Sequence, residues 1–443
     1  MIFNLHFPVQ LTFHDKTKTS AYNADDIHLG YTIKETERSQ PVLNGRFKLE
    51  PQIKLTDYDP KAVIDWVEIS FHTEKEHQAI NIHSYIGKNV TSRSLSKSIF
   101  VSGLNRKPRY QGKEFIVRIQ EPHPKDLPQI MNAINRHYNL VMESGYLFGI
   151  AGIEISMDFY PKRNATYNND ARDLYRWRMT ELLRKHLVVD PALFERSYDQ
   201  PRIIVGTGRY TKPLFSMEPE LYKEPTKERV KRLLAIDIPN AMALGKHIKP
   251  EIDGTVYFGE KNKEVMIRLM DKTTDRRSGQ NAIDLEHIDQ RSRIEITFLK
   301  REEDRGTRGV LSAIGLNEPY DLYNANFEKL RKLAFDFYIP TVKVVELDGK
   351  KKPCGKELKV FERTGAFGLD IYQRAELMKL SADEKGKKTA FGKKGYREAY
   401  VALNKQVRRA MHKLQIDWGK HREVMLKEAP MVPKGFKPVT IED

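Results

Sequence analysis

The amino-acid sequence predicts an α+β fold whose core is an antiparallel, ferredoxin-like sheet. Short runs of β-branched and aromatic residues, typical of strands, occupy residues 65–72, 114–120, 152–160, 255–258, 264–270 and 291–299. Segments with apolar residues at helical spacing predict helices at 127–143, 170–187 and 317–337. Strands that alternate with crossing helices in this way favour an α+β core of antiparallel strands.

The chain divides into three regions by composition. Residues 1–60 are polar and contain four prolines, which predicts a partly irregular or β-rich lead-in. Residues 61–345 contain the predicted core. Residues 346–443 form a basic region with helices expected at 366–381 and 395–415, and with a disordered end from Pro430.

Net positive charge is the strongest compositional signal. Lys and Arg number 76 against 60 Asp and Glu, a net charge of +16. From residue 343 onward there are 24 basic and 14 acidic residues, so 24 − 14 = +10 of this charge lies in the last hundred residues. Such a concentration predicts contacts with DNA phosphates, although a solvated surface is the alternative for any single pair. The residues expected to contact DNA are Lys387, Lys388, Lys393, Lys394, Arg408 and Arg409 in this region, and Arg293 in the predicted core.

Other features narrow the class of protein. The mean hydropathy is −0.60 and no run of about 20 apolar residues occurs, so a membrane partner is not expected. The N-terminus lacks the pattern of a secretion signal, and the single cysteine, Cys354, fits a reducing, cytoplasmic location. A metal would therefore be held by oxygen ligands or histidines.

Three predicted strands each place charged groups on one face and apolar groups on the other. Glu154, Ser156 and Asp158 share one face of their strand, and Arg293, Glu295 and Thr297 share a face of another. Arg268, Met270 and Lys272 align on a third strand. One such strand alone is typical of an amphipathic sheet with a solvated face. Carboxylates on neighbouring strands with cations beside them instead favour a site for Mg²⁺ or Mn²⁺ that acts on a phosphodiester.

The candidate nucleophiles for such a reaction are two tyrosines that follow the strand containing Glu295. Tyr320 and Tyr323 are three residues apart and would share one helical face. A tyrosine hydroxyl can attack a phosphodiester and form a covalent phosphotyrosine link with a free 3′-hydroxyl. Packing residues are the alternative reading, and Tyr323 ranks slightly ahead of Tyr320 as the candidate.

These segments resemble the replication initiation factor (Rep_trans) family of rolling-circle replication initiators and related relaxases, which is distantly similar to the HUH endonucleases. Residues 255–272 look like the family's Tyr-x-Gly hairpin followed by Arg-x-Tyr-x-Lys, and 65–71 look like its opening strand. Residues 152–158 and 293–295 look like its Arg-x-Asp-x-x-x-Asp and Arg-x-Glu strands. The resemblance covers about 60–345, in the expected order.

The resemblance implies a nickase core with particular residue roles. By resemblance, Glu154, Asp158 and Glu295 are the metal-site acids, and Arg268 and Lys272 support the phosphate. The family's tyrosine lies a short way beyond the Arg-x-Glu strand, which again indicates Tyr320 or Tyr323. The expected partners are origin DNA and a host helicase, and a homodimer is one open alternative for the oligomeric state.

Three positions depart from the family pattern. Gly152 stands in place of the leading Arg, Glu154 in place of the first Asp, and Met270 where the family often has a tyrosine. Two functions therefore remain open from the sequence. The first is a metal-dependent, site-specific nickase and strand transferase, and the second is a DNA-binding initiator or regulator that keeps the fold without nicking.

Overall fold

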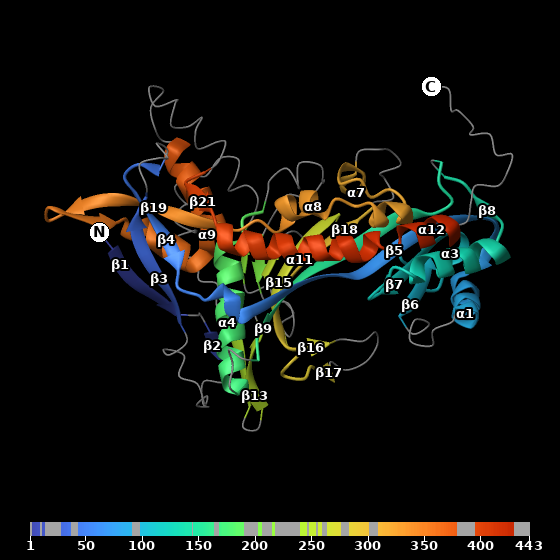
Figure 1. The fold of residues 1–443 in the computed structure, drawn as a ribbon, viewed down its shortest axis with the longest axis horizontal. Helices are drawn as coiled ribbons and strands as arrows, with labels where there is room; N and C mark the ends of the chain where they lie inside the picture. Colours follow the sequence, from blue (N-terminus) through green and yellow to red (C-terminus); the bar gives the residue numbers. More distant parts are fainter. Residues whose placement is uncertain are drawn as a thin grey trace.

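The computed structural model describes most of the chain, with the strands between residues 203 and 258 described by their backbone. The described residues are 2–8, 11–13, 28–36, 43–90, 98–143, 145–163, 168–189, 203–205, 215–217, 240–245, 248–253, 256–258, 264–275, 283–300, 309–378 and 395–428. The molecule is elongated: the smaller sheet, with β1, β3, β4 and β19, lies at one end, and the larger sheet extends from the middle to the other end with α11 lying along it (Figure 1). Among the described residues, no helix is both long and apolar enough to cross a membrane.

A ten-stranded antiparallel sheet forms the larger part of the fold, in the order β11-β10-β14-β15-β18-β9-β5-β7-β6, with β8 also paired to β5. Its strands are β5 (Tyr58–Gln78), β6 (Ile99–Gly103), β7 (Gln111–Gln120), β8 (Leu140–Val141), β9 (Gly149–Pro161), β10 (Ile203–Val205), β11 (Phe215–Met217), β14 (Val256–Phe258), β15 (Val265–Lys272) and β18 (Arg291–Leu299). The expected α+β class with antiparallel strands is confirmed. The predicted pairing of 255–258 with 264–270 is also found, between β14 and β15.

A second sheet joins the beginning of the chain to its last third, in the order β1-β3-β4-β19-β20, with β21 also paired to β19. Its strands are β1 (Ile2–Pro8), β3 (His28–Glu35), β4 (Arg46–Pro51), β19 (Tyr338–Leu347), β20 (Lys350–Pro353) and β21 (Arg397–Ala399). The predicted boundaries at residues 60 and 345 fall inside β5 and β19. The lead-in and the basic region thus meet in one sheet, at the end of the molecule where Figure 1 labels β1, β4 and β19.

The remaining strands form small sheets. β2 (Leu11–Phe13), β12 (Asn240–Gly245) and β13 (Ile248–Asp253) form a three-stranded sheet in which β2 runs parallel to β12, and β16 (Thr274–Asp275) pairs with β17 (Ile283–Asp284). The helices are α1 (Ala79–Asn89), α3 (Asp126–His137), α4 (Asn169–His186), α7 (Val310–Ala313), α8 (Phe327–Ala334), α9 (Gly355–Met378), α11 (Val401–Gly419) and α12 (Arg422–Glu428), with short 3₁₀ helices η3 (Leu55–Asp57) and η5 (Pro319–Tyr323).

Helices cover one face of the large sheet. On β18, the Ser292 hydroxyl donates to the Arg176 carbonyl of α4 at 2.7 Å and bonds the Thr180 hydroxyl at 2.9 Å, so Ser292 faces α4. Strand alternation places Ile294, Ile296 and Phe298 on this same face. They belong to one core cluster together with Ile64, Val67 and Ile69 of β5 and the apolar side of α11. The opposite face of β18 carries Arg293, Glu295 and Thr297.

Several predicted helices have different bounds in the structure. The helix expected at 127–143 ends at His137, because the chain then enters the short strand β8. The helix expected at 317–337 is divided into η5 and α8, and residues 397–399 of the helix expected at 395–415 form β21. The helix expected at 366–381 corresponds to the second part of α9, which begins after the non-helical residue Gly365 (φ of 68°). A separate helical stretch precedes it from Gly355.

A buried ion pair fixes the second sheet to α9. Arg46 on β4 donates to the Glu357 carboxylate at 2.9 Å, and to the Thr341 hydroxyl and carbonyl of β19 at 2.8 and 3.0 Å. The guanidinium also lies 4.1 Å from the centre of the Tyr396 ring. The side chains of Arg46 and Glu357 are 8% and 9% exposed. The positive charge of Arg46 and the negative charge of Glu357 therefore neutralise each other inside the protein.

Replacing Arg46 by Ala should destabilise the protein strongly, because Glu357 is then left buried without its counter-ion. We expect the free energy of unfolding to fall by about 3–5 kcal/mol, measured by urea denaturation. The double variant Arg46→Met with Glu357→Leu should recover most of this loss, since it removes both charges and keeps the volume. If Arg46→Ala lowers the free energy of unfolding by less than about 1 kcal/mol, water reaches Glu357 in the variant.

Candidate metal centre

The register of three strands brings charged side chains together on the face of the sheet opposite the helices. Glu295 on β18 lies between Arg268 on β15 and Ser156 on β9. Two residues further along β18, Thr297 pairs with Glu154 of β9. Directly paired residues of antiparallel strands hold their Cβ atoms about 5 Å apart on the same face, so Glu154 and Glu295 become diagonal neighbours.

A β-bulge adds Asp65 to this group. Ile64 pairs with Ile155 and Trp66 pairs with Glu154, which leaves Asp65 as an extra residue in β5 with no partner in β9. A bulge turns the extra side chain toward the face of its neighbour. Asp65 accordingly receives hydrogen bonds from Ser156 Oγ at 2.5 Å and from Arg293 Nη1 at 2.7 Å.

The carboxylates of Asp65, Glu154 and Glu295 form one cluster. One oxygen from each lies within 4.8 Å of the others. Oxygen ligands of Mg²⁺ lie about 2.1 Å from the ion, so two on opposite sides of it are about 4.2 Å apart. The separation in the structure, within 4.8 Å, is slightly larger than this value. The donor set therefore suits a hard divalent cation such as Mg²⁺ or Mn²⁺.

Two arginines line the carboxylate cluster. Arg268 makes a short ion pair with Glu295 and a longer one, at 3.4 Å, with Glu154. Arg293 Nη1 contacts Asp65 at 2.7 Å and Glu295 at 3.3 Å. The Arg268 side chain is 27% exposed, whereas Arg293 is 6% exposed. Arg268 is therefore the more accessible of the two cations.

Asp158 lies on the same face but has a different environment. Arg293 donates to it with Nε at 2.5 Å and with Nη2 at 2.6 Å, and Arg291 Nε lies 3.0 Å from its Oδ2. This two-pronged contact fixes the plane of the Arg293 guanidinium and aims its third nitrogen at the cluster. The three-carboxylate group contains Asp65 in the place where the sequence suggested Asp158.

Burial disfavours the ionised form of the carboxylates in this cluster. Burial raises the pKa of Glu154 to about 7, with Glu295 adding to the effect, and raises that of Asp65 to about 6 despite the proximity of Arg293. The neighbouring carboxylates hold the pKa of Arg293 well above its ordinary value in spite of its burial. A divalent cation would relieve this excess of negative charge, because it favours the ionised carboxylates.

Lys272 lies further along β15, where it pairs in register with Arg291. Its ammonium contacts Asp275 at 3.4 Å. In the described part of the chain, the structure gives it no contact with Asp65, Glu154 or Glu295. Met270 is the paired neighbour of Arg293.

The two candidate tyrosines lie in η5 and face the helices. The Tyr323 hydroxyl is buried, donates to the Pro124 carbonyl, and its ring packs against Trp418 of α11. Burial raises the pKa of Tyr323 above its ordinary value. The Tyr320 hydroxyl accepts a hydrogen bond from Arg422 Nε at 2.9 Å, and hydrogen bonds from Asn324 and Arg422 lower its pKa. Neither hydroxyl has a described contact with the carboxylate cluster.

The predicted phosphate-binding residues are described only in part. Arg408 and Arg409 lie on the exposed side of α11, where Arg408 contacts Glu328 of α8 at 3.3 Å. Lys387, Lys388, Lys393 and Lys394 lie outside the described residues, as does the predicted disordered end from Pro430.

Asp65 is the member of the cluster that sequence reasoning missed. The strand alternates regularly from Trp66 to Phe71, and this pattern places Asp65 on the core face with Val67. The available signal was a charged residue at a core position of a strand, which is a mark of a bulge or a functional site.

Comparisons with known proteins give little support beyond the geometry. No family model matches the sequence, and no curated protein matches it. A solved structure of a rolling circle replication initiator protein from Geobacillus stearothermophilus aligns with 70% of this chain and 97% of its own chain, at 10% sequence identity and a TM-score of 0.24. A likeness this distant carries no conclusion about fold or function.

The raised pKa of Glu154 predicts how stability depends on pH. The group has a pKa of about 7 in the folded protein and 4.5 ordinarily, so the metal-free protein loses stability as the pH rises between these values. Glu154→Gln removes this titration. We expect the variant's advantage in free energy of unfolding to grow between pH 5 and pH 8, to on the order of 3 kcal/mol. Thermal and urea unfolding in EDTA measure it.

Mn²⁺ provides the control for this experiment. The ion should stabilise wild type at pH 8 and leave Glu154→Gln nearly unchanged, because the variant lacks one ligand. The assignment of the raised pKa to Glu154 is contradicted if Glu154→Gln changes the free energy of unfolding by the same amount at pH 5 and pH 8.

Proposed function

We propose that this protein nicks one strand of DNA at a replication or transfer origin, as a rolling-circle initiator or relaxase does. The observation that carries the proposal is the group of three carboxylates on β5, β9 and β18 with Arg268 at its open side. Carboxylates that bind Mg²⁺ or Mn²⁺ next to an exposed guanidinium are suited to a phosphodiester substrate. The net charge of +16 favours a polyanionic partner of this kind.

The residues of the cluster have separate roles in this proposal. Asp65, Glu154 and Glu295 would hold the metal, which when bound supplies Lewis-acid polarisation of the scissile phosphate. Arg268 binds a phosphate oxygen when it leaves Glu295. Asp158 is a positioning residue, because its two contacts with Arg293 orient that guanidinium toward the reacting group.

The attacking group proposed from the sequence is a tyrosine. Its hydroxyl gives up a proton to a base, the oxygen bonds to the 5′-phosphate, the bond from phosphorus to the 3′-oxygen breaks, and that oxygen takes a proton to become a 3′-hydroxyl. Tyr320 is better suited than Tyr323, because its pKa is lowered and its hydroxyl contacts Arg422. Tyr320 reaches the carboxylates only if η5 moves or if a second copy of the chain supplies it.

Two observations favour a second function, that of an initiator that binds DNA without cutting it. Arg268 and Arg293 already compensate the carboxylates, and both tyrosines point toward the helices rather than the cluster. In that case the face is a structural network of ion pairs.

A nicking assay tests the proposal. The substrate is a supercoiled plasmid that carries the DNA flanking the protein's own gene, incubated with Mn²⁺ and followed by the appearance of open circles. We expect Glu154→Gln and Glu295→Gln to lower the nicking rate by at least about 100-fold, because each loses a metal ligand. Asp158→Asn should lower it less, since Asp158 acts through Arg293. A wild-type protein that binds this DNA and never nicks it establishes the second function.

The chemistry of the cut ends identifies the nucleophile. Tyrosine attack leaves protein covalently attached to the 5′ end, whereas attack by water leaves a free 5′-phosphate. Tyr320→Phe should abolish the covalent adduct, and Tyr323→Phe should keep it. Adduct formation that survives both substitutions would refute the assignment of either tyrosine.

A further inference from the structure

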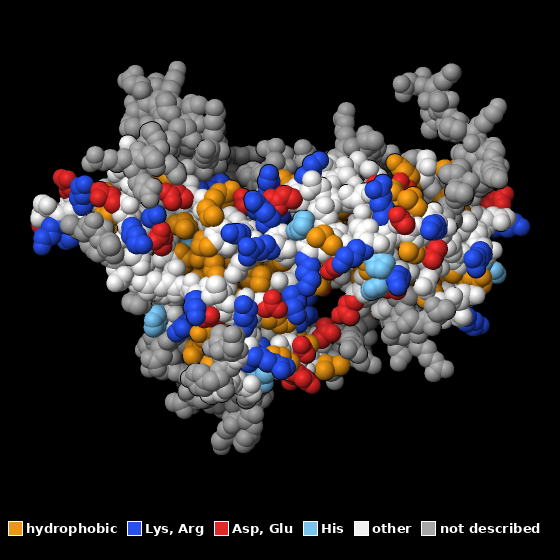
Figure 2. Space-filling model, viewed as in Figure 1, with side chains coloured by type: hydrophobic (Ala, Val, Ile, Leu, Met, Phe, Trp, Pro, Cys, Tyr) orange, Lys and Arg blue, Asp and Glu red, His pale blue; other side chains and the backbone are white. Residues whose placement is uncertain are grey.

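The exposed side of α11 is an almost uniformly cationic surface. Residues 401–420 contain five Lys and Arg and one acid, Asp417, which pairs with Lys420 at 3.3 Å. The other side of the helix is apolar and buried against β5 and α8: Leu403, Val407, Ala410, Met411, Leu414 and Trp418. Because these residues fix the helix to the sheet, its cations are held in place as one array. Figure 2 shows Lys and Arg side chains along the course of α11.

The cations are regularly spaced along the helix. Lys405, Arg409 and Lys413 are exposed and recur every four residues, so they stand in a row about 6 Å apart along the axis. Within the described residues, none of the three makes an ion pair. Holding such like charges side by side costs free energy, and a polyanion that neutralises them recovers it.

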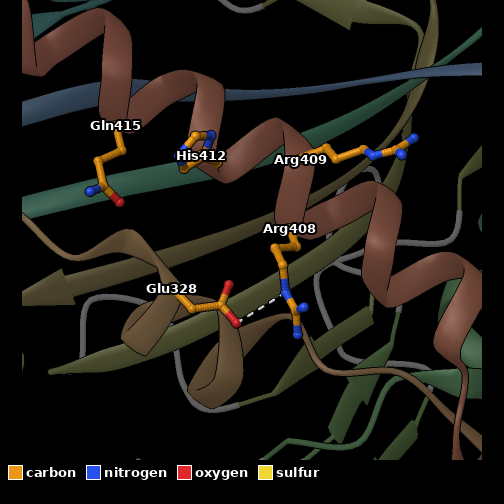
Figure 3. A pocket seen from close by; sticks show the side chains of 5 residues that line it. All are labelled: Glu328, Arg408, Arg409, His412 and Gln415. Atoms are coloured by element: carbon orange, nitrogen blue, oxygen red, sulfur yellow. Dashed lines mark ion pairs between the residues drawn. The ribbon is translucent and has the colours of Figure 1, made fainter.

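A groove beside this row widens the surface. A cavity of about 430 Å³ lies between α8 and α11 and is lined by Glu328, Arg408, Arg409, His412 and Gln415. In Figure 3, Arg408 reaches down to Glu328, while Arg409 and His412 project from α11 on either side of it. Lys329 and Lys332 of α8 are exposed as well. The exposed cations thus belong to two helices that pack against each other, and Lys and Arg side chains are common donors to DNA phosphates.

This surface and the carboxylate cluster lie on opposite sides of the large sheet. The apolar side of α11 packs in the core cluster with Ile64, Val67 and Ile69, whereas Glu295 is on the other face of the sheet. A helix about 10 Å across and the sheet itself therefore separate the two, on the order of 15 Å. A single phosphate cannot contact both.

We propose that the exposed side of α11, with the α8 groove, binds the phosphate backbone of double-stranded DNA apart from the strand that is cut. This inference rests on the proposed action on DNA and adds a second, non-cleaving contact surface. Duplex is favoured over single-stranded DNA because single strands are commonly held by exposed aromatic side chains. The large exposed apolar side chains of α11 and α12 are Val401, Ile416 and Leu426, and none is aromatic.

The binding is expected to be independent of base sequence. α11 lies flat on the sheet, with one side fully packed, so it presents the ends of its Lys and Arg side chains rather than a protruding helix for the major groove. Contacts of this type neutralise phosphates and release counterions, so the affinity falls steeply with salt.

Fluorescence anisotropy with a labelled 24-base-pair duplex of arbitrary sequence tests the proposal in the full chain, in EDTA so that cleavage plays no part. The variant is Lys405→Ala with Arg409→Ala and Lys413→Ala. We expect a loss of at least about tenfold in affinity at 100 mM salt, and a slope of log K against log[salt] that is shallower by about 2.7, which is 0.9 for each of three phosphates.

A matched variant removes the same charge elsewhere. Lys75→Ala with Lys88→Ala and Lys113→Ala changes three exposed lysines near α1 and should keep the slope of wild type. Equal thermal midpoints establish that both triple variants are folded. An equal loss in the two variants, or an unchanged slope for the α11 variant, overturns the proposal.

Two further ligands address other occupants of the surface. A single-stranded 24-mer that binds as tightly as the duplex, with the same dependence on α11, overturns the assignment to duplex DNA. Vesicles of phosphatidylserine that bind wild type in preference to the duplex assign the surface to a membrane instead. Because the readout is binding without metal, a failure here is distinct from a failure to nick.

Discussion

The antiparallel pairing of β18 with β9 is the constraint on which the functional face depends. This pairing sets Arg293 opposite Asp158, Glu295 opposite Ser156, and Thr297 opposite Glu154. A slip of one residue would turn every one of these groups into the core and every isoleucine out of it. The contact of Arg293 with Asp158 holds this register from the polar side, while Ile294 and Ile296 hold it from the apolar side. Charge and hydrophobic burial therefore specify the same alignment.

Much of this face could be predicted from the sequence because strand alternation is a local property. Glu154, Glu295 and Arg268 were each placed on a polar face by their neighbours, and the structure brings the three together. Strand alternation does not identify Asp65, because the β-bulge at this residue interrupts the two-residue period of β5. The sequence does not indicate that Asp65 has no partner in β9. Asp158 was grouped with the acids because sequence spacing does not show that Arg291 and Arg293 both contact it.

The environments of the tyrosines and of the chain's ends could not be predicted from local sequence, because residues distant in the chain determine them. Tyr323 is buried by Trp418 and by the carbonyl of Pro124, almost two hundred residues before it. The apolar spacing that predicted a single helix around these tyrosines arises from two short helices that pack on α11. The second sheet likewise unites β4 with β19, and no local pattern in residues 1–60 indicates such a partner.

The sheet that unites β4 with β19 also sets the order in which the chain can fold during synthesis. Arg46 bonds Thr341, which is 295 residues later in the chain. At roughly 5–20 residues per second, a ribosome needs about 15–60 s to make that stretch. Throughout this interval β4 has an open edge and Arg46 has no partner, while the large sheet can already assemble around β5, β7 and β9. The second sheet is therefore completed late in translation, and its exposed edge is where a newly made chain is most open to pairing with another.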